Sequence, residues 1–335
     1  MMVITGKLKM KLLDSLGRTI NYIRISLTDR CNLNCFYCEP DKLYEKFPKD
    51  EILRVEEIIY LISLFCRKFG IKKFRFTGGE PLLRRGLKEI IEGVRKEIGD
   101  NVELTITTNG MFLKNFAEFF KEHKVRVNIS LDTLNEEKFK KISGFYGLSN
   151  IIHNIDYSKN LGLKLKINTV LLRGINDDEI SDLINFSKEK DVKIRFIEFM
   201  PISVDVNLWR KNFISEGEVI KALQQKRKIK FIGADDIERT YLVDDEIQIG
   251  FISTVSHPFC QGCSRIRLSS DGKIYLCLFD PDGYDIKKFI RPKISEDELC
   301  KFIYDVVKLK PEGFIKFKRE GTLPKMSPIM KQIGG

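Results

Sequence analysis

The feature that most constrains the fold is an alternation, repeated six times between residue 21 and about residue 200, of a short β-branched run and a longer amphipathic stretch. This alternation is typical of βα units around a parallel sheet. It predicts strands near 21–28, 73–77, 102–107, 125–131, 163–170 and 192–198. Helical periodicity predicts helices near 54–69, 86–98, 114–122, 135–142, 150–161 and 177–189. We therefore predict an α/β fold, an incomplete TIM-like (β/α)6 barrel.

The predicted strands have one apolar and one polar face, because their apolar and polar residues alternate. Helices must cover the apolar face, so the polar face points into the barrel lumen. The cations expected there are Arg24, Arg75, Lys166 and Arg195. Unpaired buried charge is unfavourable, so the lumen is predicted to hold a polyanion and water. Three lysines at strand starts fit either the lumen or ordinary solvent: Lys73, Lys164 and Lys193.

The segment Cys31-Asn-Leu-Asn-Cys35-Phe-Tyr-Cys38 places three thiols directly after the first predicted strand. Three thiolates are one fewer than a closed tetrahedral metal site needs. A cubane iron–sulfur cluster on three cysteines leaves one iron for a ligand from outside the protein. A structural zinc site with a distant fourth ligand is the alternative.

This Cys-x3-Cys-x2-Cys spacing and the turn Thr77-Gly78-Gly79-Glu80-Pro81 resemble the radical S-adenosylmethionine (SAM) enzymes. The resemblance implies a [4Fe–4S] cluster on Cys31, Cys35 and Cys38 that binds SAM and cleaves it reductively to a 5′-deoxyadenosyl radical. Glycines let a backbone approach a ligand closely. The carboxylate of Glu80 can pair with an ammonium.

After about residue 205 the repeat stops, and a helix near 215–226 and short strands near 229–232, 239–243 and 247–252 are predicted. This pattern indicates a smaller C-terminal α+β unit, so we predict two domains, 1–205 and 206–335. The second contains Cys260-Gln-Gly-Cys263 and Cys277, to which His257 would add a fourth ligand if the site held zinc. Cys66 and Cys300 lie in apolar helical patterns and are expected to be buried small hydrophobes.

Two three-cysteine groups, a cationic lumen, Arg265-Ile266-Arg267 and a terminal Gly-Gly together resemble the GTP 3′,8-cyclase family, which acts first in molybdenum cofactor biosynthesis. The resemblance implies a second [4Fe–4S] cluster on Cys260, Cys263 and Cys277 whose free iron binds guanine. In the implied reaction, the radical removes the ribose 3′ hydrogen and C3′ attacks C8, which gives 3′,8-cyclo-7,8-dihydro-GTP. The resemblance further implies that the C-terminal Gly334 and Gly335 enter the active site and support catalysis there.

The resemblance also implies individual binding residues. SAM is expected at Tyr37, Gly79, Ser130 and Met200. GTP is expected at Arg24, Arg75, Thr107, Lys166, Arg195, Arg265, Ile266 and Arg267. The position of Thr107 is ambiguous by one residue because Thr108 follows it. An ordinary frayed end is the alternative for the terminal glycines.

The chain has 335 residues and a formal net charge of +11, which fits anionic partners and also heat adaptation. No apolar run approaches the roughly 20 residues of a membrane span, and no RNA-binding signature is present. We expect neither a membrane nor a nucleic acid as partner, and the many thiols without a secretory signal indicate the cytoplasm. The electron donor is unknown and a homodimer is left open. The rival functions are a peptide-modifying radical SAM enzyme and an RNA-binding iron–sulfur or zinc protein.

Overall fold

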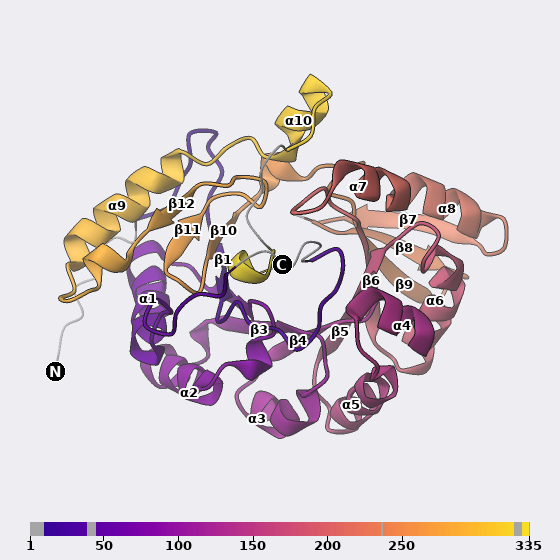
Figure 1. Ribbon diagram of the computed structural model, residues 1–335, viewed down its shortest axis with the longest axis horizontal. Coiled ribbons are helices and arrows are strands. Elements are labelled where there is room, and N and C mark those ends of the chain that lie inside the picture. Colours follow the sequence, from indigo (N-terminus) through magenta and orange to yellow (C-terminus); the bar gives the residue numbers. More distant parts are fainter. Residues whose placement is uncertain (1–9, 39–44, 236, 325–329, 335) are drawn as a thin grey trace.

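A single curled sheet of twelve strands organises the molecule (Figure 1). The structure is a computed structural model and describes residues 10–38, 45–235, 237–324 and 330–334. The strand order is β12-β11-β10-β1-β2-β3-β4-β5-β6-β9-β8-β7. All pairings from β10 through β1 to β9 are parallel.

The six central strands confirm the predicted βα alternation, with each end within two residues of its prediction. They are β1 (Tyr22–Ser26), β2 (Lys73–Thr77), β3 (Glu103–Thr108), β4 (Arg126–Ser130), β5 (Leu165–Leu171) and β6 (Lys193–Glu198). Their apolar residues, such as Ile23 and Phe74, are buried under the helices. The opposite face of the strands lines the concave side of the sheet.

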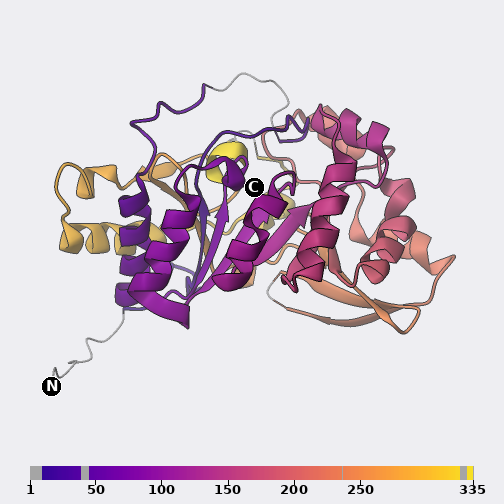
Figure 2. The same cartoon turned by 90° about the horizontal axis from the view of Figure 1, so that it is seen from below.

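Six helices belong to the βα repeat; five of them cover the convex side of the sheet, and the one over Glu136–Ser143 packs against the loop after β1 (Figures 1 and 2). The six are α1 (Val55–Phe69), α2 (Leu87–Ile98), α3 (Ala117–Glu122), α4 (Glu136–Ser143), α5 (Leu148–Asn160) and α6 (Ile180–Glu189). Both α4 and α5 lie between β4 and β5. The predicted helices at 114–122 and 177–189 each begin with a short 3-10 turn before the α-helix. These elements confirm the incomplete barrel.

The chain after the barrel first extends the sheet beyond β6. The elements are α7 (Val206–Asn212), α8 (Glu216–Gln224), β7 (Ile229–Ala234), β8 (Arg239–Val243) and β9 (Ile247–Ile252). Strand β9 pairs in parallel with β6, and β8 and β7 follow it antiparallel. The predicted helix and three strands of this segment are confirmed.

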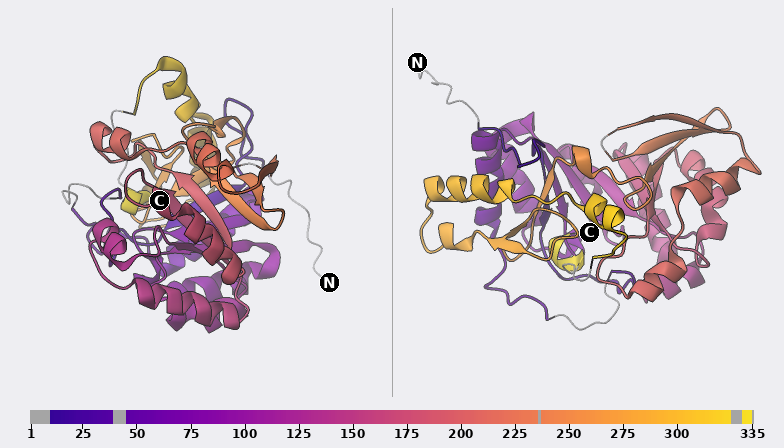
Figure 3. Two further views of the ribbon diagram at one scale, coloured as in Figure 1. Left: turned by 90° about the vertical axis from the view of Figure 1, so that its right-hand side faces the viewer. Right: turned by 90° about the horizontal axis from the view of Figure 1, so that it is seen from above.

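The chain then crosses to the other edge of the sheet, next to β1 (Figure 3). The strands there, absent from the sequence prediction, are β10 (Arg265–Leu268), β11 (Lys273–Tyr275) and β12 (Gly283–Asp285). The remaining helices are α9 (Glu296–Lys308), α10 (Phe314–Glu320) and α11 (Met330–Ile333). Figure 1 shows α11 inside the curve of the sheet, beside β1. No helix within the described ranges has the length and apolar character to cross a membrane.

The packing between sheet and helices predicts a strong dependence on single core residues. Phe76 in β2 is fully buried, so Phe76→Ala should lower the free energy of unfolding of the metal-free chain by about 3–5 kcal/mol. Phe145, which is 45% exposed, provides the control, since Phe145→Ala should change stability by less than about 1 kcal/mol. Urea unfolding followed by circular dichroism measures both. Equal losses for the two variants would contradict this account of the core.

Candidate active site

The first thiol group lies in the loop that follows β1. The backbone N–H of Leu33 donates to Cys31 Sγ at 3.4 Å, and Asn109 Nδ2 approaches the same sulfur at 3.9 Å. Cys31, Cys35 and Cys38 are half-buried and line a cavity on the concave side of the sheet. Burial raises the pKa of Cys35 well above its usual value, and the neighbouring Cys38 adds to the effect. Burial therefore favours the neutral thiol at Cys31 and Cys35.

The Gly78-Gly79-Glu80-Pro81 turn packs directly against this loop. Gly79 N donates to Thr28 O at 2.7 Å, and Glu80 N donates to Arg30 O at 2.8 Å. A Cβ atom at Gly79 would lie 2.6 Å from the carbonyl carbon of Arg30, so any other residue would push the two segments apart. Glycine is therefore required here by the protein's own backbone, before any ligand is considered.

Glu80 is a buried carboxylate at the carboxyl ends of β2 and β3. Its oxygens accept from Thr108 Oγ1 at 2.7 Å and from the backbone N–H of Asn109 at 2.8 Å. Burial raises the pKa of Glu80 to about 7, although these hydrogen bonds favour the ionised form. A group with this pKa exchanges protons near neutral pH.

Tyr37 and Asp132 form a hydrogen-bonded pair beside the first thiol group. Tyr37 OH donates to Asp132 Oδ2 at 2.5 Å, and Val170 N donates to Asp132 Oδ1 at 2.8 Å. Burial raises the pKa of Asp132 to about 6. The four residues expected to contact SAM all line this cavity: Tyr37, Gly79, Ser130 and Met200.

The second thiol group opens into the same cavity. Cys260 lies in a 3-10 turn, Cys263 precedes β10, and Cys277 follows β11. Gly313, at φ +81°, lies behind them, and a Cβ atom there would be 2.9 Å from Cys260 Sγ and 3.7 Å from Cys277 Sγ. The absence of a side chain at Gly313 therefore provides the space that the two sulfur atoms occupy.

Three cations lie around the second thiol group: Arg18, Lys310 and Arg265. Arg18, which is ion-paired with Asp14, donates to Cys260 O at 2.9 Å and to Pro311 O at 2.7 Å. Burial would raise the pKa of Cys263, but the ammonium of Lys310 and the guanidinium of Arg265 outweigh it and lower that pKa. The environment at Cys263 thus favours a thiolate.

Three guanidinium groups lie in a row across neighbouring strands. Parallel pairing places Arg267 of β10 opposite Arg24 of β1, and Arg24 opposite Arg75 of β2. Paired residues of adjacent strands share one face and lie about 5 Å apart. Burial lowers the pKa of Arg24 well below its usual value, and the charges of Arg267 and Arg75 add to the effect. Positive charge is therefore concentrated on this face.

Three buried donors of this face lack acceptors among the described residues. Within the described part of the chain, Arg75 Nε, Thr107 Oγ1 and Tyr22 OH have no hydrogen-bond partner. Thr108, by contrast, is already bonded to Glu80. Buried donors without acceptors are rare in folded proteins and indicate a ligand that carries acceptors.

The cationic lumen expected from the sequence is partly neutralised at one side. Arg195 donates to Asn168 Oδ1 at 2.9 Å and to Asn128 Oδ1 at 3.0 Å. Burial, together with the charge of Arg75, lowers the pKa of Arg195 to about 10. Glu238, from the segment before β8, forms an ion pair with Lys193, so the charge of this lysine is compensated within the protein.

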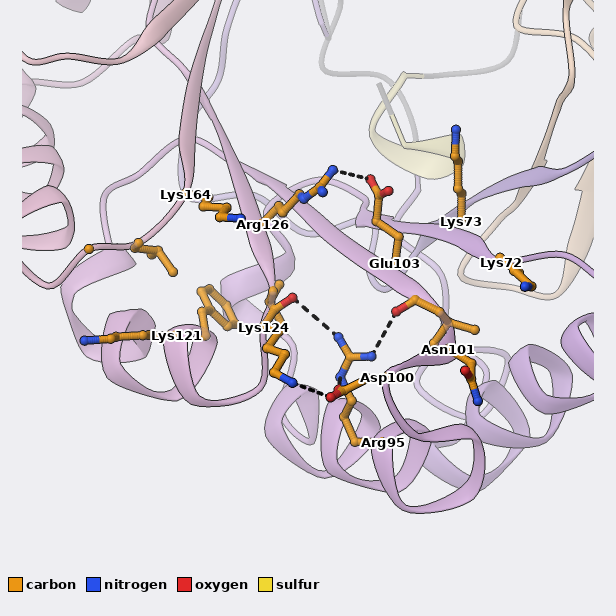
Figure 4. A pocket seen from close by; sticks show the side chains of 15 residues that line it. Lys72, Lys73, Arg95, Asp100, Asn101, Glu103, Lys121, Lys124, Arg126 and Lys164 are labelled. Atoms are coloured by element: carbon orange, nitrogen blue, oxygen red, sulfur yellow. Dashed lines mark hydrogen bonds and ion pairs between the residues drawn. The ribbon is translucent and has the colours of Figure 1, made fainter.

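Several predicted residues lie apart from the cavity lining. Lys166 is exposed beside Arg195 and is absent from the lining, and the Ile266 side chain is buried in the core. Lys73 and Lys164 lie around a different, open cavity at the amino ends of the strands (Figure 4). Cys66 and Cys300 are buried, as predicted.

The C-terminal helix α11 brings the tail to the arginine row. Arg267 donates to the carbonyl oxygens of Ile333, at 3.4 Å, and Gly334. Gly334 has φ +76°, and a Cβ atom there would overlap Thr77 Cγ2 and lie 3.3 Å from Thr77 Cβ. Gly334 is therefore enclosed between β2 and β10, while Gly335 lies outside the described residues.

All eight cysteines are free, and their arrangement does not favour zinc. A zinc ion needs ligand atoms that converge at about 2.0–2.3 Å. Among the described residues, no three His, Cys, Asp or Glu side chains converge in this way. His257 contacts Ser256 Oγ at 3.0 Å and lies 3.5 Å from Glu216 instead. A cubane suits two sets of three thiols around one cavity better, because each thiolate binds a different iron.

Known proteins resemble the chain over almost its whole length. The profile of the radical SAM superfamily matches residues 25–187, and that of Molybdenum Cofactor Synthesis C matches residues 192–315. The GTP 3′,8-cyclase of Thermodesulfovibrio yellowstonii is 39% identical over 96% of this chain and 99% of its own length. That of Aquifex aeolicus is 38% identical over 97% of this chain and 100% of its own. The chain belongs to the GTP 3′,8-cyclase family of radical SAM enzymes.

Solved structures agree with this fold assignment. Streptococcus suis SuiB bound to S-adenosylmethionine superposes with a TM-score of 0.63 at 15% identity, over 87% of this chain and 68% of SuiB. The anSMEcpe structure with bound AdoMet gives a TM-score of 0.51 at 22% identity, over 61% of this chain and 58% of its own. At these identities the likeness concerns the fold alone. Members of the family use SAM and two [4Fe–4S] clusters, as the sequence resemblance implied.

Sequence reasoning missed residues whose partners are distant in the chain. Asp132 has a usable signal, because it follows β4 at the same strand end as Ser130. Arg18, Glu238 and Lys310 had none, since their roles depend on contacts made by remote segments.

The room at Gly313 yields a prediction about the second thiol group. Gly313→Ala should displace Cys260 and remove about half of the iron bound after anaerobic reconstitution, because one of two four-iron clusters is lost. Gly321 also has positive φ but nothing near its Cβ position, so Gly321→Ala carries similar backbone strain as a control and should keep full iron. Iron and sulfide analysis measures both. Full iron in Gly313→Ala would contradict the crowding argument.

Proposed function

We propose that this protein binds GTP in the concave cavity of the barrel and converts it to 3′,8-cyclo-7,8-dihydro-GTP, the first step of molybdenum cofactor biosynthesis. The observation that carries the proposal is the arginine row beside the unsatisfied donors of Arg75, Thr107 and Tyr22, joined in one cavity to two groups of three thiols. A triphosphate supplies both the charge and the acceptors that this face lacks.

The residues proposed to bind GTP come from both edges of the barrel opening. Arg24, Arg75 and Arg267 form the row, and Arg265 extends it along β10. Thr107 is favoured over Thr108, whose hydroxyl is committed to Glu80. Arg195 joins them from β6, and Lys166 adds charge beside it. Ile266 contributes through its main chain only, because its side chain is in the core.

The SAM side is proposed to use the loop after β1 and the carboxyl ends of the next strands. Cys31, Cys35 and Cys38 would hold the first [4Fe–4S] cluster, and Cys260, Cys263 and Cys277 the second. When bound there, the first cluster would supply the electron for reductive cleavage of SAM. Tyr37, Gly79, Ser130 and Met200 would contact SAM, and Glu80 would accept a hydrogen bond from its amino group.

The tail is proposed to close the nucleotide site. Gly334 lies against Arg267 and Thr77, where a larger residue does not fit, and Gly335 is expected to continue toward the substrate. This closure would exclude water from the reacting ribose and hold it near the radical source. The division of the chain at residue 205, a homodimer and a cytoplasmic location stay predictions.

One experiment tests the function. The protein is reconstituted anaerobically with iron and sulfide and incubated with SAM, dithionite and GTP. We expect 5′-deoxyadenosine that depends on GTP, together with the cyclised nucleotide. Deleting Gly334 and Gly335 should keep iron content and SAM binding but abolish the cyclised product. Turnover without GTP, or cyclisation by the truncated chain, would count against this assignment.

The arginine row predicts a loss of GTP affinity. Arg75→Ala removes a buried donor from the row and should weaken GTP binding about ten- to hundredfold, as expected for a charged hydrogen bond worth about 1.5–3 kcal/mol. Lys166→Ala should weaken it as well. Arg126→Ala is the control, because Arg126 is paired with Glu103 at the amino end of β4. Equilibrium dialysis with the reconstituted protein measures the dissociation constants. Parental affinity in Arg75→Ala would refute the proposed site.

The pKa of Glu80, raised to about 7 by burial, predicts a pH dependence of SAM binding. The ionised carboxylate accepts the hydrogen bond from SAM, and its fraction falls about fivefold between pH 7 and pH 6. The side chain of the Glu80→Gln variant cannot titrate. The ratio of its dissociation constant for SAM to that of the parent should therefore fall about fivefold from pH 7 to pH 6. Anaerobic calorimetry at both pH values gives the two dissociation constants. A ratio that stays constant with pH would show that Glu80 does not titrate in this range.

A further inference from the structure

Lys310, directly after α9, is a buried cation without a buried counter-ion. Its side chain is almost completely enclosed, with 3% of the residue exposed. The ammonium donates to Arg265 O at 2.7 Å and to Leu276 O. Within the described part of the chain, no carboxylate forms an ion pair with it. A buried charge of this kind is unfavourable unless another charge compensates it.

The groups beside this ammonium are the second set of thiols and the half-buried carboxylate of Asp280. Leu276 directly precedes Cys277, and Arg265 lies two residues after Cys263, so both hydrogen bonds hold the ammonium beside this set. Lys310 also lines the shared cavity. The neighbouring Arg18 compensates less of the thiolate charge, because it already forms an ion pair with Asp14.

We propose that Lys310 is a positioning residue of the second cluster, a fixed counter-charge that helps to retain the cluster and raises its reduction potential. The inference rests on the proposed function, which places a [4Fe–4S] cluster on Cys260, Cys263 and Cys277. Three thiolates outweigh the two positive charges of the oxidised cubane, and reduction adds a further negative charge. A nearby ammonium therefore stabilises the reduced form more than the oxidised form.

The hydrogen bonds of Lys310 allow a competing explanation, in which the residue only supports the start of β10. Two substitutions distinguish the role of a counter-charge from that of a structural support. Lys310→Gln keeps a hydrogen-bond donor and removes the charge, whereas Lys310→Arg keeps the charge with a different shape. Lys308 lies two residues earlier on α9, exposed and paired with Asp305, so Lys308→Gln is the matched control for charge removal.

The experiment uses the full chain with Cys31, Cys35 and Cys38 replaced by Ser, so that only the second cluster is present. Each Lys variant is made in this background and reconstituted anaerobically. Iron and sulfide analysis gives cluster retention, and a redox titration followed by electron paramagnetic resonance gives the reduction potential. Thermal unfolding of each metal-free chain monitors the fold.

For Lys310→Gln we expect the ratio of reduced to oxidised cluster, at a given potential, to fall at least tenfold. For a one-electron couple this equals a downward shift of about 59 mV. Lys310→Arg and Lys308→Gln should stay close to the parent. Loss of the cluster from Lys310→Gln, with normal unfolding of the metal-free chain and retention in Lys310→Arg, would also support the counter-charge.

Three outcomes overturn the proposal. An unchanged or raised potential in Lys310→Gln removes the charge effect and leaves the proposed function intact. Loss of the cluster from both Lys310 variants, with earlier unfolding of the metal-free chain, assigns the residue to the support of β10. Absence of a second cluster from the parent of this series contradicts the proposed function itself, and the inference with it.

Discussion

Parallel pairing between β1 and β10 joins the first barrel strand to a segment far along the chain, with Tyr22 opposite Arg265. The apolar pairs Ile23 with Ile266 and Ile25 with Leu268 fix this register through the core. A shift by one residue would turn the arginines into the core and the apolar residues into the cavity. One register therefore decides that the arginines of β10 join those of β1 and β2, and that the second thiol group faces the same cavity as the first.

The cationic face prepares the protein for an anionic ligand, but it destabilises the folded chain when no ligand is bound. Burial lowers the pKa of Arg24 and the like charges of the row add to the effect, while other buried donors in the described part of the chain remain without acceptors. The chain offsets part of the cost internally. Asn168 and Asn128 accept from Arg195, and the tail carbonyls accept from Arg267. What remains uncompensated matches a bound triphosphate, so the protein departs from ordinary packing rules where the ligand is proposed to bind.

The sequence alone predicted the elements whose signal is local. Alternating strand faces gave the six barrel strands and the convex core, and the spacing of the cysteines gave both thiol groups. Strands β10 to β12 were missed because they are short and their partner β1 is remote in the chain. Lys193 was left undecided for a similar reason, since its partner Glu238 arrives from a distant segment. Local sequence patterns show on which face of a strand a side chain lies, whereas the pairing of distant strands decides which residues it contacts.

The tail connects the two halves of the site through contacts of its own. Gly334 lies against Thr77, the residue that opens the Gly-Gly-Glu-Pro turn beside the first thiol group. Its carbonyl accepts from Arg267, four residues after Cys263 of the second group. Lys331 adds a bond at 3.2 Å to Leu33 O, between Cys31 and Cys35. The requirement for glycine at residue 334 thus arises from the walls around it, and the tail can dock only when both thiol-bearing segments are already in place.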